Sequence, residues 1–158
     1  MADSKKLKQH FLLPGALFVK DEDYAITTVL GSCIAICIWD KTLLKGGINH
    51  YKLPLWNGEG IPTPKYGNIA INILIEKMFD MGCKRSNLTA KVFGGGAVLK
   101  GTKGVMNVGK RNIDVAWDML NIEKIPVIAS SVGGENSRKI IFSTNDGSVL
   151  MKKSHSVL

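Results

Sequence analysis

The spacing of apolar residues along the chain predicts a protein built mainly from β-strands. Residues 26–30 and 33–39 are β-branched, apolar runs, and Gly31-Ser32 separate them. The second run is apolar on both faces, which is typical of a strand deep inside a sheet. Residues 43–53 then predict the strand that returns antiparallel to it, with a possible bulge at Gly46-Gly47.

The rest of the chain predicts two helices and four more strands. Apolar residues recur at helical spacing over residues 66–81 and over residues 112–121. Short apolar runs predict strands at 89–93, 125–131, 139–143 and 148–152. Because strands outnumber helices and gather at both ends of the chain, we expect an α+β fold in layers rather than a doubly wound parallel sheet.

Length and composition are those of one globular domain. The 158 residues include 45% hydrophobic and 22% charged side chains, which excludes a disordered chain, collagen or a coiled coil. We therefore expect a single domain over residues 1–158, with residues 1–10 as a flexible tail. No apolar run is long enough for a membrane helix, and acidic residues 21–23 stand where a signal peptide would need small ones. Three cysteines, an odd number, favour a reducing compartment, so a cytoplasmic protein is expected.

The basic residues give a net charge of +8, which attracts acidic partners without identifying them. Residues 81–113 contain seven basic and no acidic side chains. A nucleic-acid-binding face and an ordinary solvated surface both fit this stretch, although Phe93 is its only aromatic residue. The glycine-rich run at 94–104 does not match a P-loop, because Thr102-Lys103 stand where Lys and then Ser or Thr are required. We expect a loop there whose backbone approaches a neighbour closely.

The predicted hairpin places a thiol opposite an imidazole. A turn centred between residues 41 and 42 pairs Cys33 with His50, with Cβ atoms about 4.5–5.5 Å apart. A thiol is mostly protonated at neutral pH, so it needs a neighbouring base to become a nucleophile. Thr27 is a candidate to hold the imidazole in one tautomer, and backbone N–H groups at Ser32 are candidates to bind an oxyanion.

Other interpretations of these residues stay open. Asp23 and Asp40 are further candidates to hold the imidazole. Taken alone, Cys33 also fits an inert buried thiol, and His50 also fits a structural histidine. The other two cysteines are expected to be core or surface thiols, and the chain has no spacing of His and Cys typical of a zinc site.

Several motifs, taken together and in order, resemble the CheD family of chemoreceptor glutamine deamidases. The resemblance covers the chain from about Pro14 to Lys152. The motifs are residues 27–33 (TTVLGSC), His50 with Leu53-Pro54 after it, Lys65-Tyr66, Gly94-Gly95-Gly96, residues 107–112 (NVGKRN), and Val132-Gly133-Gly134 with Arg138. Tyr51-Lys52 and Ser137 depart from what is common in the family, outside the proposed catalytic residues.

The resemblance implies both a fold and a reaction. The fold is an α/β sandwich related to toxin-type cysteine deamidases, and Cys33, His50 and Thr27 match a papain-like triad. The reaction is that of a cysteine amidohydrolase, a protein-glutamine glutaminase, which converts glutamine side chains to glutamate with release of ammonia. No cofactor or metal is implied.

The resemblance also implies the partners. The substrates are glutamines on the cytoplasmic helical bundle of methyl-accepting chemotaxis receptors, and a CheC-type response-regulator phosphatase is a second partner. Neither nucleic-acid binding nor membrane insertion belongs to this interpretation. Two rivals are a non-catalytic regulatory module that binds receptors or the phosphatase, and a basic nucleic-acid-binding domain.

Overall fold

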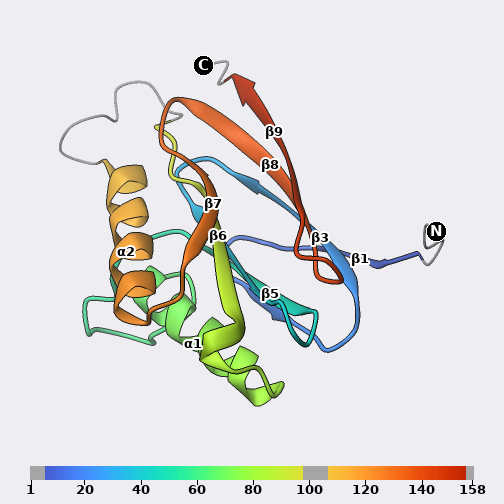
Figure 1. Cartoon of the computed structure of the whole chain (residues 1–158). Coiled ribbons are helices and arrows are strands. Elements are labelled where there is room, and N and C mark those ends of the chain that lie inside the picture. Colours follow the sequence, from blue (N-terminus) through green and yellow to red (C-terminus); the bar gives the residue numbers. More distant parts are fainter. Residues whose placement is uncertain (1–5, 98–106, 156–158) are drawn as a thin grey trace.

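The strands form two mixed sheets that pack face to face (Figure 1). The computed structural model describes residues 6–97 and 107–155. The elements in chain order are β1 (Lys8–Phe11), β2 (Leu17–Val19), β3 (Tyr24–Leu30), β4 (Ile34–Asp40), β5 (Lys45–Tyr51), α1 (Gly67–Asp80), the 3-10 turn η1 (Arg85–Asn87), β6 (Leu88–Gly94), α2 (Val108–Ile122), β7 (Val127–Val132), β8 (Asn136–Ser143) and β9 (Val149–His155). One sheet has the order β1-β3-β8-β9 and the other the order β2-β5-β4-β6-β7.

The two helices cover the face of the five-stranded sheet that points away from the four-stranded sheet (Figure 1). On β4, Ile34, Ile36 and Ile38 pack against the helices, while Ala35 and Cys37 point into the cluster between the sheets. Strand β4 is therefore buried on both faces, as its apolar run predicts. The expected α+β sandwich of mixed sheets with two outer helices is confirmed.

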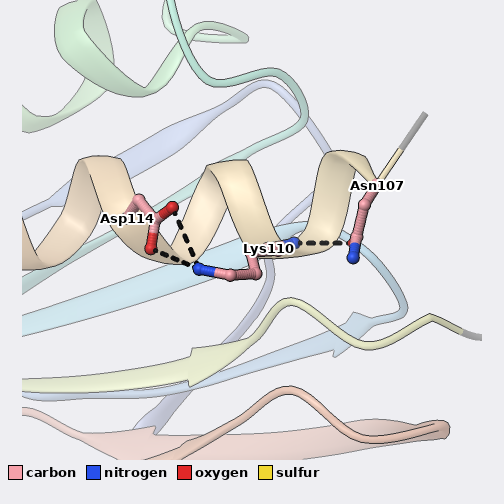
Figure 2. A network of polar contacts seen from close by, with 3 residues as sticks. All are labelled: Asn107, Lys110 and Asp114. Atoms are coloured by element: carbon pink, nitrogen blue, oxygen red, sulfur yellow. Dashed lines mark hydrogen bonds and ion pairs between the residues drawn. The ribbon is translucent and has the colours of Figure 1, made fainter. Parts of the chain in front are cut away.

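Helix α2 begins four residues before its predicted start, because a side chain caps it. The side-chain oxygen Oδ1 of Asn107 accepts a hydrogen bond from Lys110 N at 3.1 Å, as is typical of an N-cap residue. Figure 2 shows this bond together with the ion pair between Lys110 and Asp114 one turn further on, at 3.3 Å. The cap orders the first turns of α2, which carry residues of the site described below.

Residues 8–10 are not part of a flexible tail, as we expected for residues 1–10, and residues 1–5 of that prediction lie outside the described part of the chain. Lys8–Phe11 form strand β1, parallel to β3, and the ring of His10 stacks on Phe18. Most side chains of β1 are exposed because it is an edge strand, so its polar sequence resembles a tail. Strand β2, at the edge of the other sheet, was also not predicted.

The hairpin of β4 and β5 has a different register from the predicted one. Its turn contains residues 41–44, and Asp40 stabilises it by accepting hydrogen bonds from the N–H groups of Thr42 and Leu43 at 2.8 Å each. The turn centre is one residue later than predicted, because two exposed leucines belong to the turn and not to the strand. Gly46-Gly47 pair regularly with β4, so they form no bulge.

Candidate active site

Cys33 lies at the connection between the two sheets. It follows Gly31-Ser32, where the chain leaves β3 in one sheet and enters β4 in the other. Its side chain is partly exposed and packs against the cluster between the sheets. Cys37 and Cys83 are buried, so Cys33 is the most accessible of the three thiols.

His50 faces the same inter-sheet space but is not directly opposite Cys33. The register pairs His50 with Ala35, two residues after Cys33. Direct opposition was therefore a wrong prediction, but a shift of two residues leaves both side chains on one face. Such diagonal neighbours lie about 7–8 Å apart, within reach of long side chains. In this structure the Cys33 thiol makes no hydrogen bond with the ring, as is often the case in catalytic sites without substrate.

Thr28, and not Thr27, holds the imidazole. Thr28 Oγ1 lies 2.7 Å from His50 Nδ1, so the bond connects the four-stranded sheet to the five-stranded one. Thr27 is on the outer face of β3 beside Val29 and Lys139, where it borders a surface hollow. Successive side chains of a strand point to opposite faces, so only one of these two neighbouring threonines can face His50, and the prediction of Thr27 was wrong. The alternation of Ile26, Thr28 and Leu30, all buried, is the sequence signal that identifies the inward threonine.

The hydrogen bonds of Thr28 determine the tautomer of His50. The hydroxyl of Thr28 donates its single hydrogen to the Leu12 carbonyl at 2.8 Å, since a carbonyl can only accept. Thr28 Oγ1 must therefore accept the proton from His50 Nδ1. The lone pair is then left on Nε2, which is buried and has no partner in the part of the chain that the structure describes. An imidazole in this state is a base at Nε2.

The segment between β1 and β2 holds both residues by backbone contacts. Leu12 N donates to Thr27 O at 2.8 Å, so the Leu12 carbonyl is fixed beside β3. On the other sheet, Gly15 N donates to His50 O at 2.8 Å, and His50 N donates to Ala16 O at 3.1 Å. The threonine and the histidine are thus connected through residues 12–16 as well as through their side chains.

The two aspartates considered for this role lie elsewhere. Asp40 is at the far end of β4, seven residues from Cys33 or roughly 23 Å along a strand, where it stabilises the hairpin turn. Asp23 precedes β3 and is five residues, or about 16 Å, from Thr28. Neither carboxylate is placed to hold the ring.

Burial keeps both the imidazole and the thiol uncharged at neutral pH. It lowers the pKa of His50 to about 4, and the nearby Lys52 ammonium acts in the same direction. Burial raises the pKa of the Cys33 thiol, and Lys52 opposes that increase. The pair therefore starts as thiol and neutral imidazole, so a proton must move to Nε2 when the sulfur attacks.

The backbone around Cys33 is held by its carbonyl groups. The Gly31 carbonyl accepts a hydrogen bond from Gly96 N at 2.9 Å, and the Cys33 carbonyl accepts one from Gly95 N at 2.8 Å. Between them, the Ser32 carbonyl accepts a hydrogen bond from Asn112 Nδ2 at 2.9 Å. In a trans peptide the following N–H points away from the carbonyl. The N–H groups of Ser32 and Cys33 therefore point away from these donors, and neither makes a hydrogen bond within residues 6–97 and 107–155.

The glycines at the end of β6 and directly after it allow this close approach, as predicted. A Cβ atom on Gly94 would lie far inside van der Waals contact with the Cys33 carbonyl oxygen, and Gly94 has a φ of +111°. Gly109 in the first turn of α2 packs directly on the carbonyls of Gly95 and Gly96. The later glycines of this run, Gly101 and Gly104, lie outside the described residues.

Comparisons with known proteins identify the family. A family model described as CheD chemotactic sensory transduction matches residues 54–153. The chain is 46% identical to a probable chemoreceptor glutamine deamidase CheD of Trichlorobacter lovleyi, over 94% of this chain and 92% of that protein. It is 42% identical to a protein of the same name from Sulfurimonas denitrificans, over 92% and 94% of the two chains.

The chain belongs to the CheD family. The match to the family model begins after His50. The alignment with the first relative covers 94% of this chain, so it must include residues 27–50 as well. The family motifs that are distant in sequence meet around Cys33. Buried Arg138 donates to the Gly133 carbonyl at 2.8 Å, and Gly133 N donates to Gly94 O at 2.9 Å, next to the Cys33 connection.

Several of the basic residues in the stretch 81–113 have local partners. Arg85 pairs with Glu123, and Lys110 pairs with Asp114. Lys91 donates to the Gly147 carbonyl at 2.9 Å. Among residues 6–97 and 107–155, no helix is long and apolar enough to cross a membrane.

Proposed function

We propose that this CheD-family chain is a cysteine-dependent protein-glutamine deamidase. The observation that carries the proposal is the Thr28–His50 hydrogen bond at 2.7 Å, which leaves an unprotonated Nε2 on the face where Cys33 lies. The substrate class comes from the relatives, which are named chemoreceptor glutamine deamidases. Thr28 replaces Thr27 as the third residue of the proposed triad.

In the first half of the reaction, Cys33 Sγ attacks the side-chain carbonyl carbon of a glutamine. His50 Nε2 takes the thiol proton as the carbon–sulfur bond forms, and the N–H groups of Ser32 and Cys33 stabilise the oxygen that becomes negative. The imidazolium then returns the proton to the nitrogen, and the carbon–nitrogen bond breaks. Ammonia leaves, and a glutamyl thioester on Cys33 remains.

In the second half, water replaces ammonia on the same atoms. His50 Nε2 takes a proton from the water, whose oxygen attacks the thioester carbon. The carbon–sulfur bond breaks, and the proton returns to Cys33 Sγ. The net reaction consumes one water and converts glutamine to glutamate plus ammonia, without a cofactor.

The partners and location belong to the same proposal. The substrate is the cytoplasmic helical bundle of methyl-accepting chemotaxis receptors, which places the protein in the cytoplasm. A CheC-type response-regulator phosphatase is proposed as a second partner. Residues 1–158 are taken as one deamidase domain.

Mass spectrometry of a receptor cytoplasmic fragment tests the function directly. After incubation with the protein, we expect each modified glutamine to gain about one dalton, with an equal amount of ammonia in solution. Binding of the fragment without this mass change would favour the non-catalytic regulatory module. DNA binding that weakens steeply with salt, without ammonia release, would favour the nucleic-acid-binding domain.

Replacing Thr28 by valine tests the third residue of the triad. Valine keeps the β-branched shape and removes only the hydroxyl, so we expect a folded protein. Nδ1 then loses its acceptor and the ring loses its fixed tautomer, so the rate of ammonia release should fall by about one to three decades. The matched control is Thr27→Val on the outer face of the same strand, which should stay within about twofold of wild type. Loss of activity in Thr27→Val alone would contradict this geometry.

A further inference from the structure

The amide of Asn112 connects the two backbone segments that carry the thiol and the imidazole. Asn112 is on α2, completely buried. Its Nδ2 donates one hydrogen to the Ser32 carbonyl at 2.9 Å and the other to the Lys52 carbonyl at 3.0 Å. Ser32 precedes Cys33 by one residue, and Lys52 follows His50 by two.

The bond to Ser32 also orients the proposed oxyanion donor. The Ser32 carbonyl and the Cys33 N–H belong to one planar peptide unit and point in opposite directions. By holding the carbonyl on the α2 side, Asn112 turns the Cys33 N–H to the other side. The second bond ties Lys52, just after β5, to the same nitrogen, so Asn112 extends the connection between the two strands one step beyond their last ladder pair, Ile34 with Tyr51.

A role limited to packing does not explain an asparagine at this position. Its Oδ1 is buried and has no hydrogen-bond partner within the described residues, which costs stability. An apolar side chain of similar volume would avoid that cost, but it would supply no donor to either carbonyl. What distinguishes asparagine here is the pair of directional bonds from Nδ2.

We propose that Asn112 is a positioning residue of the deamidase, which holds the Cys33 backbone and the His50 strand at the distance and orientation that catalysis needs. This inference rests on the proposed function. It goes beyond the triad, because Asn112 acts through Cys33 and His50 and does not touch the reacting atoms itself.

Alkylation of Cys33 by iodoacetamide tests this role in the whole protein without receptor. The reaction forms no oxyanion, so its rate near neutral pH reports on the thiol and the help it receives from His50, independently of the oxyanion donors. We expect His50→Ala to slow it by about tenfold or more, and Asn112→Ala to slow it by a similar factor. In the double variant the two losses should not multiply, because both remove the same assistance. Losses that multiply, or a rate unchanged in Asn112→Ala, would overturn the inference.

Deamidation kinetics add a second measurement. Asn112→Ala should lower kcat by about 10- to 100-fold with KM within about twofold, because substrate binding remains while alignment is lost. An increase in KM with kcat unchanged would also overturn the role. If Asn112→Ala does not fold, Asn112→Ser can be used, because serine keeps one donor in a smaller side chain. We expect it to lower kcat by a smaller factor, again with KM nearly unchanged.

Tyr51→Phe is the matched control. The Tyr51 hydroxyl donates to the backbone carbonyl of Asn112 at 2.6 Å, so phenylalanine removes a buried bond to the same residue while the Nδ2 bonds stay. We expect a lower melting temperature but a normal Cys33 alkylation rate. An equal slowing in Tyr51→Phe would show that general loosening, and not the amide, is responsible. An unchanged alkylation rate of Cys33 in His50→Ala would contradict the proposed triad. A slower rate in His50→Ala with an unchanged rate in Asn112→Ala would contradict only the role of Asn112.

Discussion

Cys33→Ala is expected to abolish ammonia release from a receptor fragment, with a loss on the order of 10³-fold or more. Every proposed step passes through a bond to its sulfur, so no other residue can substitute for it. Alanine removes one partly exposed atom and should leave the fold intact. The measurement is the initial rate of ammonia release, with circular dichroism to verify folding.

The other two cysteines provide the controls. Cys37 lies in the cluster between the sheets, and Cys83 lies in the cluster under the helices. Burial raises the pKa of the Cys37 thiol strongly and that of Cys83 to about 12, so neither is a nucleophile at neutral pH. Cys37→Ala and Cys83→Ala should each retain activity, at a stability cost of about 1 kcal/mol. Activity lost in Cys37→Ala and kept in Cys33→Ala would refute the proposed nucleophile.

Gly94→Ala should have the second-largest effect, on stability and on activity together. The φ of Gly94 is +111°, where side chains are strained, and the new methyl group would overlap the Cys33 carbonyl oxygen. Left-handed strain alone costs about 1–3 kcal/mol, and the overlap adds to it by displacing the nucleophile's backbone. Urea unfolding should therefore show a loss above about 2 kcal/mol, and any folded fraction should have little deamidase activity.

Gly82→Ala separates strain from overlap. Gly82 has a similar φ of +95°, but a Cβ there would have no atom within 4 Å. It follows α1 near Lys45, at the opposite end of the hairpin from Cys33. We expect a loss of about 1 kcal/mol with normal activity. Equal effects of the two substitutions would mean that contact with the Cys33 carbonyl is unimportant.

The fold class, and the placement of Cys33 and His50 on one face, could be predicted from the sequence because they depend on local patterns. The doubly apolar β4 and the periodicity of α1 are each visible within about fifteen residues. The turn position was predicted wrongly, and this shifted the strand register by two residues. Because side chains along a strand repeat with a period of two, Cys33 and His50 still lie on one face.

What could not be predicted depends on contacts between distant segments. The alternation of Ile26, Thr28 and Leu30 indicates which threonine points inward, but only the position of the other sheet brings that threonine to His50. Asn112 has no local signal of its role, because its two acceptors lie 80 and 60 residues away in sequence. Strand β1 is polar because it lies at a sheet edge, and its pairing with β3 is not encoded by its own pattern.

The contact between Thr28 and Leu12 has a consequence for how the chain tolerates change. The acceptor that fixes the proton on His50 is a main-chain carbonyl, which every amino acid possesses. Substituting residue 12 therefore alters packing but cannot remove the acceptor, whereas deleting residues 6–12 would remove it while β3, β4 and β5 remain. We therefore expect catalysis to tolerate variation at this position but not a truncation that removes Leu12.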